Sequence, residues 1–334
     1  MNTLFFLTTL IVLGAILFDF INGFHDTANA VATSVSTKAL KPRQAIVLAA
    51  FMNMLGALSF TGVAKTITSG IVDPFQLHNG SLVLISALLA GIGWNLITWY
   101  YGIPSSSSHA IIGAIAGASI VASGVQAVNF RGFIKIIESL IISPVLAYAL
   151  GYIVFIILKN IFQNCNLINM NRRFRYLQVL TAALQAFTHG TNDAQKSMGI
   201  ITMALLTGGY IKSDTIPFWV QLACALAMGT GTFVGGWRII KTVGGKLMKI
   251  RPINGVAADL TGASIIFGAT LLQLPVSTTH VISSSVLGVG SAQRIKSVHW
   301  RTAQRIIITW FITLPLSALF AGIIYYLLHT LFPM

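Results

Sequence analysis

The chain has 334 residues, of which 55% are hydrophobic and only 8% are charged, and it contains 30 glycines. This balance excludes an ordinary soluble domain, and apolar stretches of roughly 20 residues, enough to cross a bilayer, recur along the whole length. The net charge of +14 comes from short basic clusters between apolar stretches, so it indicates membrane topology rather than a nucleic-acid-binding face. We predict an all-α polytopic membrane protein.

The first half of the chain contains five apolar segments. The first of them would be roughly 51 Å long as one straight helix at ~1.5 Å per residue, which is too long for one ordinary span. We therefore expect a break near Asn22 and Gly23. Between the third and fourth segments, Pro104 and a run of serines end one helix and cap the next. The expected segments are residues 4–37, 44–64, 81–101, 105–123 and 133–158.

The second half repeats this plan at an offset of 167 to 171 residues. Its proline-containing hairpin lies between apolar arms at residues 256–272 and 277–287. The repeat indicates a divergent internal duplication of the whole membrane unit. The matched positions are Asp26 with Asp193, Pro104 with Pro275, and His109 with His280.

Lys and Arg gather in four of the connecting segments, which are therefore expected to face the cytoplasm. Placing all four inside requires each proline-containing segment to be a re-entrant hairpin. Each half then crosses the membrane three times, so the second repeat is inverted and both termini are extracytoplasmic. Inverted repeats with broken helices are an architecture of secondary transporters. We expect a first repeat at residues 1–160, a cytoplasmic basic linker at 161–177 and a second repeat at 178–334.

The two hairpin tips are candidates for binding an anion. Pro104 and Pro275 each precede hydroxyl side chains that would begin a half-helix, with free N–H donors at the positive end of its dipole. Two such ends, related by inverted symmetry, would surround a tetrahedral oxyanion. The alternative is that the hydroxyls only cap the half-helices or join helices. The candidates are Ser105, Ser106, Ser107, Ser108, Ser277, Thr278 and Thr279.

A duplicated acidic motif reads NGFHDTANA at residues 22–30 and HGTNDAQKS at residues 189–197. An acid and amides are costly inside an apolar segment, so they indicate a functional site. Their oxygens suit a cation or a proton, and next to an anion pocket they indicate coupled transport. The alternative is a buried Asp held by structural hydrogen bonds. The coupling candidates are Asn22, Asp26, Asn29, Asn192, Asp193 and Lys196.

Lys196 takes the position of Asn29 in the second copy, one helical turn from Asp193. Its charge would replace a bound metal cation on that side or bind the anion, and it favours proton coupling. The alternative is that it reaches an aqueous face. Acids left outside the candidate set, because packing explains them equally well, are Asp19, Glu138 and Asp259. The candidates for a proton relay are His25, His109, His189 and His280.

Cys165 and Cys224 stand alone, without the spacing of a zinc site or of a disulfide framework. We therefore expect no resident metal and no cofactor other than the coupling ion.

At these motifs the chain resembles the inorganic phosphate transporter (PiT) family. The segments GFHDTANA and GTND look like the duplicated motif of that family, and with the hairpins the resemblance covers nearly the whole chain. It implies import of inorganic phosphate by alternating access in a homo-oligomer, expected to be a dimer or trimer. The low-affinity, proton-coupled bacterial branch is most similar, which implies the bacterial inner membrane. Some of that branch carry phosphate as a neutral complex with a divalent metal.

Several alternatives stay open. The chain departs from the sodium-coupled pattern at His25 and at residues 195–197, so proton coupling is expected and sodium symport is the alternative. A sulfate permease of the same family would use the same hydroxyl-lined tips. An intramembrane hydrolase has the residue types, but a catalytic triad needs one asymmetric nucleophile and base, whereas the duplication supplies two equivalent sets. An ion channel is a further option. We predict a transporter and not an enzyme.

Overall fold

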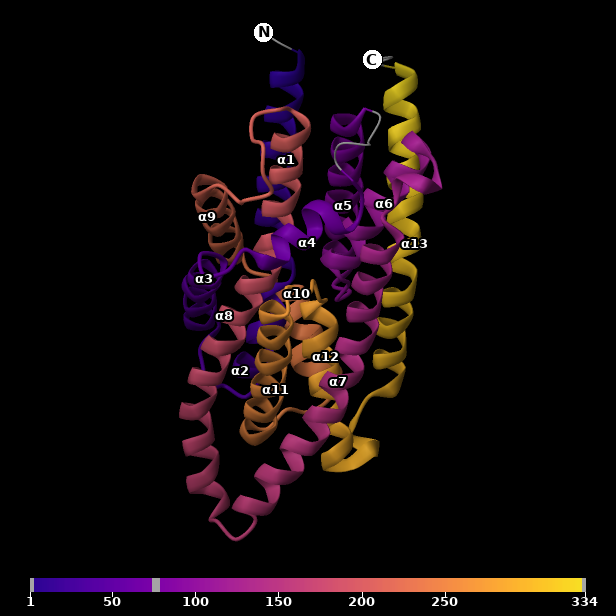
Figure 1. Cartoon of the computed structure of the whole chain (residues 1–334). Helices are drawn as coiled ribbons and strands as arrows, with labels where there is room; N and C mark the ends of the chain where they lie inside the picture. Colours follow the sequence, from indigo (N-terminus) through magenta and orange to yellow (C-terminus); the bar gives the residue numbers. More distant parts are fainter. Residues whose placement is uncertain (1–2, 74–78, 332–334) are drawn as a thin grey trace.

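The computed structural model describes residues 3–73 and 79–331, in which the regular elements are helices joined by short loops (Figure 1). The elements of the first repeat are α1 (Thr3–His25), α2 (Thr27–Ser36), α3 (Pro42–Ala57), α4 (Gly62–Gly70), α5 (Gly80–Tyr101), α6 (Ser107–Ser123), the 3-10 helix η1 (Val125–Ala127) and α7 (Phe130–Phe162). Those of the second are α8 (Leu167–Thr207), α9 (Phe218–Val234), α10 (Trp237–Lys241), the π-helix η2 (Thr242–Lys246), α11 (Pro252–Leu271), α12 (Thr278–Arg294), the 3-10 helix η3 (Ile295–Ser297) and α13 (Trp300–Leu331).

The first apolar segment is broken, but at Asp26 rather than at Asn22 and Gly23. The backbone N–H of Asp26 still donates to the carbonyl of Asn22, at 2.8 Å, so the α1 helix continues through the glycine. Gly23 instead permits close packing, because a Cβ there would lie 2.9 Å from the backbone nitrogen of Thr232 on α9. The glycine is therefore a packing position, and the acid itself marks the break.

The matching helix of the second repeat, α8, runs unbroken for 41 residues through Asp193. Gly190 again allows a close approach, since a Cβ there would overlap the carbonyl oxygen of Asn53 on α3. The second copy of the motif therefore lies inside a continuous helix, unlike the first. The basic segment predicted as a linker at 161–177 is also mostly helical, because the turn between α7 and α8 contains only residues 163–166.

The second span of each repeat is bent rather than straight. The span predicted at residues 44–64 divides into α3 and α4, which meet at 68°, and α9 meets the helix Ile239–Lys246 at 69°. Both predicted hairpins are present, as α5 with α6 and α11 with α12. By length and composition, four described helical segments are able to cross a membrane, and up to six if each bent pair is one span. The chain is a multi-pass membrane protein.

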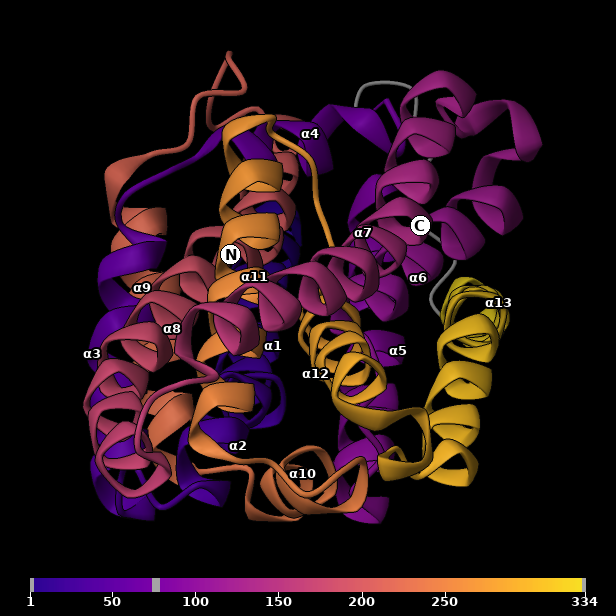
Figure 2. The ribbon, with the colours of Figure 1, turned by 90° about the horizontal axis from the view of Figure 1, so that it is seen from below.

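The two repeats pack together through equivalent pairs of helices. The last helix of each repeat packs against the second hairpin helix of the other repeat, as α7 with α12 and α13 with α6 (Figure 2). The first helix of each repeat likewise packs against the second span of the other, as α1 with α9 and α8 with α3. This reciprocal packing brings both acidic motifs and both hairpin tips to the middle of the molecule.

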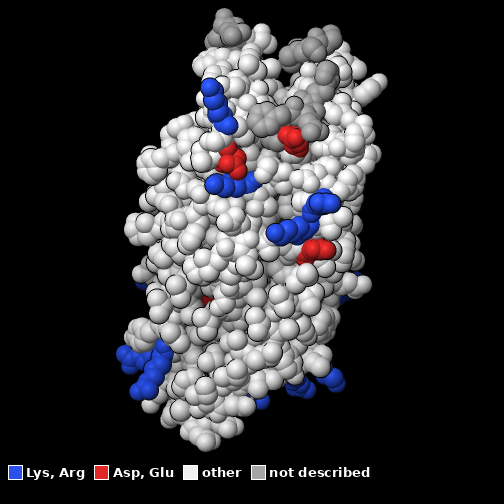
Figure 3. Space-filling view, viewed as in Figure 1, with Lys and Arg blue, Asp and Glu red and all other residues white. Residues whose placement is uncertain are grey.

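Charge is distributed unevenly between the two ends of the molecule. Both chain ends lie at the upper end in Figure 1, and the α7–α8 turn lies at the lower end. On the face shown in Figure 3, the lower end carries Lys and Arg, whereas acidic and basic side chains mix in the upper half. Because basic loops favour the cytoplasm, this distribution is consistent with a cytoplasmic lower end.

Candidate functional site

The carboxylate of Asp26 joins the two hairpin tips. Asp26 occupies the break between α1 and α2, where it is almost fully buried. Ser107, at the start of α6, donates its hydroxyl to Oδ2 at 2.5 Å, and Thr279, at the start of α12, donates to Oδ1 at 2.9 Å. One acid therefore contacts the tip of its own repeat and the tip of the other repeat.

A chain of buried polar contacts extends from Asp26 along α5. The Nδ1 atom of His25 lies 2.8 Å from Oδ1 of Asp26, and its Nε2 atom lies 3.1 Å from the hydroxyl of Thr98. Ser105 donates its own hydroxyl to Thr98 at 2.8 Å. His25 therefore connects the first acid to the hydroxyl cluster of the first tip.

Two amides beside the acids each have one unused oxygen. Asn29 donates its amide to the hydroxyl of Thr279 at 3.0 Å, and Asn22 donates to Oδ2 of Asp193 at 3.3 Å. The Oδ1 atoms of both amides are buried and have no hydrogen-bond partner among the residues that the structure describes. Unpaired buried acceptors are costly, so these two oxygens favour a cation or a proton donor nearby.

Asp193 has a partner that Asp26 lacks. Nζ of Lys196 lies 2.7 Å from Oδ1 of Asp193, and both side chains are 0% exposed. The interpretation that Lys196 reaches an aqueous face is therefore wrong. Thr278 donates to Oδ2 at 3.2 Å, and Nε2 of His189 lies 3.5 Å from the same oxygen. The unbroken α8 helix sets this geometry, because it places residues three apart on one face.

The tip hydroxyls are all buried, and each contacts other atoms of the protein. Two of them act as helix caps. Ser106 and Ser277 accept the backbone N–H groups of His109 and His280. Their predicted capping role is therefore observed. Ser108 donates to the carbonyl of Val276 at 2.8 Å, so it joins the first tip to the second. Ser107, Thr278 and Thr279 are the three tip hydroxyls that face the acids.

The side chain of Asn192, on α8, bonds to the backbone of the second hairpin. It donates to the carbonyl of Leu274 and to the hydroxyl of Thr270, each at 3.2 Å, and it accepts the N–H of Val276 at 3.2 Å. In this position Asn192 holds the second tip against α8. The geometry differs from that expected of a cation ligand.

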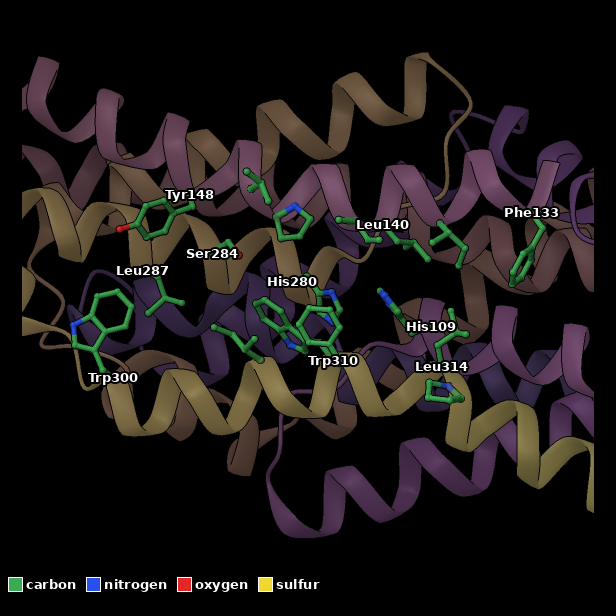
Figure 4. Close-up of a pocket in the computed structure, with 17 residues that line it drawn as sticks. His109, Phe133, Leu140, Tyr148, His280, Ser284, Leu287, Trp300, Trp310 and Leu314 are labelled. Atoms are coloured by element: carbon green, nitrogen blue, oxygen red, sulfur yellow. The ribbon is translucent and has the colours of Figure 1, made fainter. Parts of the chain in front are cut away.

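The four histidines divide into two pairs. His25 and His189 contact the acids, as described above. His109 and His280 lie behind the tips, with ring centroids 4.5 Å apart, and His280 stacks on Trp310 at 4.0 Å. The second pair lines an apolar crevice behind the tips (Figure 4).

Asn53 is a site neighbour that sequence analysis missed. It donates to the hydroxyl of Thr27 at 2.9 Å, and its Oδ1 atom lies 2.9 Å from Nδ1 of His189. It therefore links the two motifs from α3. An amide inside the apolar span at 44–64 was the signal available, since polar groups at membrane depth are costly.

The acids left outside the candidate set have different surroundings. Asp259 on α11 accepts from Thr33 at 2.6 Å and from Thr181 at 3.3 Å, so it fastens α2 and α8 to α11. Asp19 is fully buried, and Ser197 and the Asp193–Lys196 pair are its polar neighbours. Asp19 thus extends the charged cluster one turn along α1 from Asn22.

Comparisons with known proteins agree with this architecture. Residues 22–172 and residues 166–321 each match the phosphate transporter family, as expected of a duplicated chain. A relative from Bacillus subtilis (strain 168), described as a probable low-affinity inorganic phosphate transporter, is 67% identical, covering 99% of this chain and 100% of the relative. A relative of the same description from Rhizobium meliloti (strain 1021) is 41% identical over 93% of each chain. A solved structure titled the sodium-dependent phosphate transporter superposes with a TM-score of 0.89 at 26% identity, covering 97% of this chain and 99% of the other.

Proposed function

The chain belongs to the phosphate transporter family, and we propose that it imports inorganic phosphate across the bacterial inner membrane together with protons. The family and the relatives are transporters, so the chain is a transporter and not an enzyme. The choice of proton as coupling ion rests on one observation, the buried contact of 2.7 Å between Lys196 and Asp193.

Phosphate binds, in this proposal, where the two tips converge. Ser107 and Thr279 reach the same carboxylate from the two repeats, and Thr278 reaches the other. Helices α6 and α12 both begin at these tips, so their positive dipole ends favour an anion. The remaining tip hydroxyls support these three by capping the helices, by joining the two tips and, for Ser105, by bonding to Thr98 on α5.

Proton coupling follows from competition for the same donors. In the structure the carboxylate of Asp26 accepts hydrogen bonds from the hydroxyls of Ser107 and Thr279. An ionised Asp26 also repels an anion at short range. A proton on Asp26 removes that charge and releases the hydroxyls for phosphate. Proton binding and phosphate binding therefore favour each other, and this coupling is reciprocal.

Lys196 explains why the second acid does not need a metal ion. Its ammonium already neutralises Asp193 at the position that Asn29 holds in the first copy. A second cation at this place would be repelled by the ammonium in a medium of low dielectric constant. The proposal therefore assigns proton coupling to Asp26, with His25 as its relay partner, and an internal counter-ion to Asp193.

Sodium symport is the second candidate function. Sodium takes oxygen ligands from carboxylates and amides, and the unpaired Oδ1 atoms of Asn22 and Asn29 lie beside the acids. The solved relative is also named as sodium-dependent. A sodium site of this kind would belong to the first motif, because Lys196 fills the second.

Transport itself is proposed to proceed by alternating access. The interlocked repeats would rock around the central site, as in other carriers built from inverted repeats. We propose that both termini are extracytoplasmic, that the chain forms a homo-oligomer (dimer or trimer), and that phosphate enters either free or as a neutral complex with a divalent metal. A sulfate permease is the alternative with the same pocket chemistry.

The test is uptake of labelled phosphate by the purified protein in liposomes. An imposed proton gradient should drive accumulation, an equal sodium gradient should not, and a protonophore should abolish it. Excess sulfate should compete weakly. Accumulation driven by sodium alone would replace the proton proposal by the sodium one, and equal competition by sulfate would remove the assignment to phosphate.

A further inference from the structure

An apolar crevice of about 630 Å³ lies between α6, α7, α12 and α13, and its lining residues do not belong to the acidic motifs. Most of its lining is aliphatic or aromatic, and its long walls are α7 and α13 (Figure 4). Pro144 on α7 and Pro315 on α13, which occupy matching positions of the two repeats, both line it. The crevice thus lies between the matching last helices of the two repeats.

The crevice opens to the outer surface of the molecule. Its rim residues Ile141, Val145 and Phe311 are 55%, 65% and 73% exposed. They belong to helices that are long and apolar enough to cross a membrane. Apolar side chains exposed at this depth face hydrocarbon, so the material that fills the crevice comes from the bilayer or from another protein.

The shape of the crevice selects between these occupants. Phe133 and Tyr148 lie at opposite ends of it, and 15 residues of α7 span roughly 22 Å at ~1.5 Å per residue (Figure 4). A volume of about 630 Å³ over that length leaves a mean cross-section of roughly 28 Å². On the same measure, which leaves out an outer shell of ~1.4 Å, an α-helix about 10 Å across needs roughly 41 Å². The space is therefore too narrow for a helix and suits one extended hydrocarbon chain.

The two ends of the crevice differ in chemistry. Tyr148 and Trp300 lie together at one end (Figure 4). Such aromatic side chains mark the boundary between hydrocarbon and head groups. The segment around Trp300 also carries four exposed cations, which attract anionic head groups at a membrane surface. These cations are Arg294, Lys296, Arg301 and Arg305.

We propose that this crevice binds an anionic phospholipid, with one acyl chain between α7 and α13 and the head group at the basic end beside Trp300. His109 and His280 form the floor of the crevice, and they directly follow the hydroxyl clusters of the two tips. An acyl chain seated there supports the tips from behind. The binding site stands on the crevice alone, whereas an effect on transport rests on the proposed function.

The test uses a phosphatidylglycerol that carries a photoactivatable group near the end of one acyl chain. The full-length protein is reconstituted with it, irradiated, digested and mapped by mass spectrometry. We expect labelling at the crevice residues of α7 and α13, reduced several-fold by Ser284→Phe and by Val145→Trp. Leu226→Trp, at an exposed position of α9, is the control and should change nothing at the crevice.

The head-group assignment has its own measurement. Labelling by the phosphatidylglycerol probe should exceed labelling by the same probe built on phosphatidylcholine, and Arg301→Gln with Arg305→Gln should remove that preference. Even labelling of all exposed apolar faces, unaffected by the two filling variants, would overturn the site. A disulfide between two copies of Val145→Cys, without lipid labelling, would overturn it in favour of an interface between copies. Labelling of the wild type that is reduced in Ser284→Phe, with transport by that variant unchanged, would support the site and refute only its effect on transport.

Discussion

Lys196 and Asp193 form an ion pair with 2.7 Å between Nζ and Oδ1, and neither side chain is exposed. In the first copy of the motif, Asn29 occupies the position of Lys196. Among the described residues, the side chains in close contact with the Asp26 carboxylate are His25 and two hydroxyls, and the Lys196 ammonium acts on it without a direct ion pair. The two copies are therefore unequal in charge although they are similar in sequence. From this inequality we infer that Asp26 carries the coupling proton, while Asp193 is neutralised by Lys196.

The ion pair itself is testable through stability. Asp193→Asn and Lys196→Gln should each destabilise the protein, by about 3 to 5 kcal/mol, because each leaves one buried charge uncompensated. The double variant should recover most of that loss, since it buries no charge. Thermal unfolding of the four proteins in detergent measures the coupling between the two positions. Additive losses would contradict the pairing.

Lys196→Gln should also change the ion that drives transport. Without the ammonium, Asp193 is free to accept a metal cation, so we expect uptake of labelled phosphate to become responsive to a sodium gradient. Lys196→Arg, which keeps the charge, is the matched control and should remain insensitive to sodium. Retained proton coupling without any response to sodium in Lys196→Gln would contradict the counter-ion role.

The hydroxyls that face Asp26 should bind phosphate. Ser107→Ala and Thr279→Ala each remove one donor to a charged group, which contributes about 1.5 to 3 kcal/mol, so phosphate affinity should fall roughly 10- to 150-fold. Ser119→Ala is the control on the same helix, because its buried hydroxyl donates only to its own helix at Ile115. Phosphate binding is measured by calorimetry on the purified protein. Equal affinity in all three variants would exclude the tips as the anion site.

The stability of the protein should depend on close helix packing at glycines. A Cβ at Gly231 on α9 would overlap the carbonyl oxygen of Phe20 on α1, so Gly231→Ala should lower the unfolding temperature and the yield of folded protein. Gly93→Ala, where a Cβ meets nothing within 4 Å, should be neutral or stabilising by about 0.5 to 1 kcal/mol. A stable Gly231→Ala protein would show that α1 and α9 are not held this closely.

The membrane orientation is testable with the native cysteines. Cys165 is exposed in the α7–α8 turn, whereas Cys224 is buried. In intact cells a membrane-impermeant maleimide should leave Cys165 unlabelled, and a permeant one should label it. Residue 213 lies beyond the other end of α8. Ser213→Cys, made in a Cys165→Ser background, should be labelled by the impermeant maleimide as well as by the permeant one. Labelling of Cys165 from outside would reverse the proposed topology.

Sequence patterns predicted the hairpins because a proline and a capping serine are local signals. They also predicted the duplicated acids, because a charge in an apolar segment is conspicuous. Neither Gly23 nor Gly190 loosens its helix, however, because each is needed by a distant helix that packs against it. The bridge from Asn53 to His189 connects residues 136 positions apart, and no periodicity indicates such a contact. The roles of the two glycines and of Asn53 could not be predicted because they depend on packing between helices that are distant in the sequence.

The most direct measurement is the proton movement that accompanies phosphate entry, recorded with a pH electrode on lightly buffered liposomes containing the wild type or Asp26→Asn. The wild type should take up protons as phosphate enters. Asp26→Asn replaces the carboxyl group by an uncharged amide of the same shape, which cannot bind and release a proton. This variant should exchange internal for external phosphate, but it should neither accumulate phosphate against a gradient nor take up protons. Proton uptake and proton-driven accumulation in Asp26→Asn equal to those of the wild type would contradict the account.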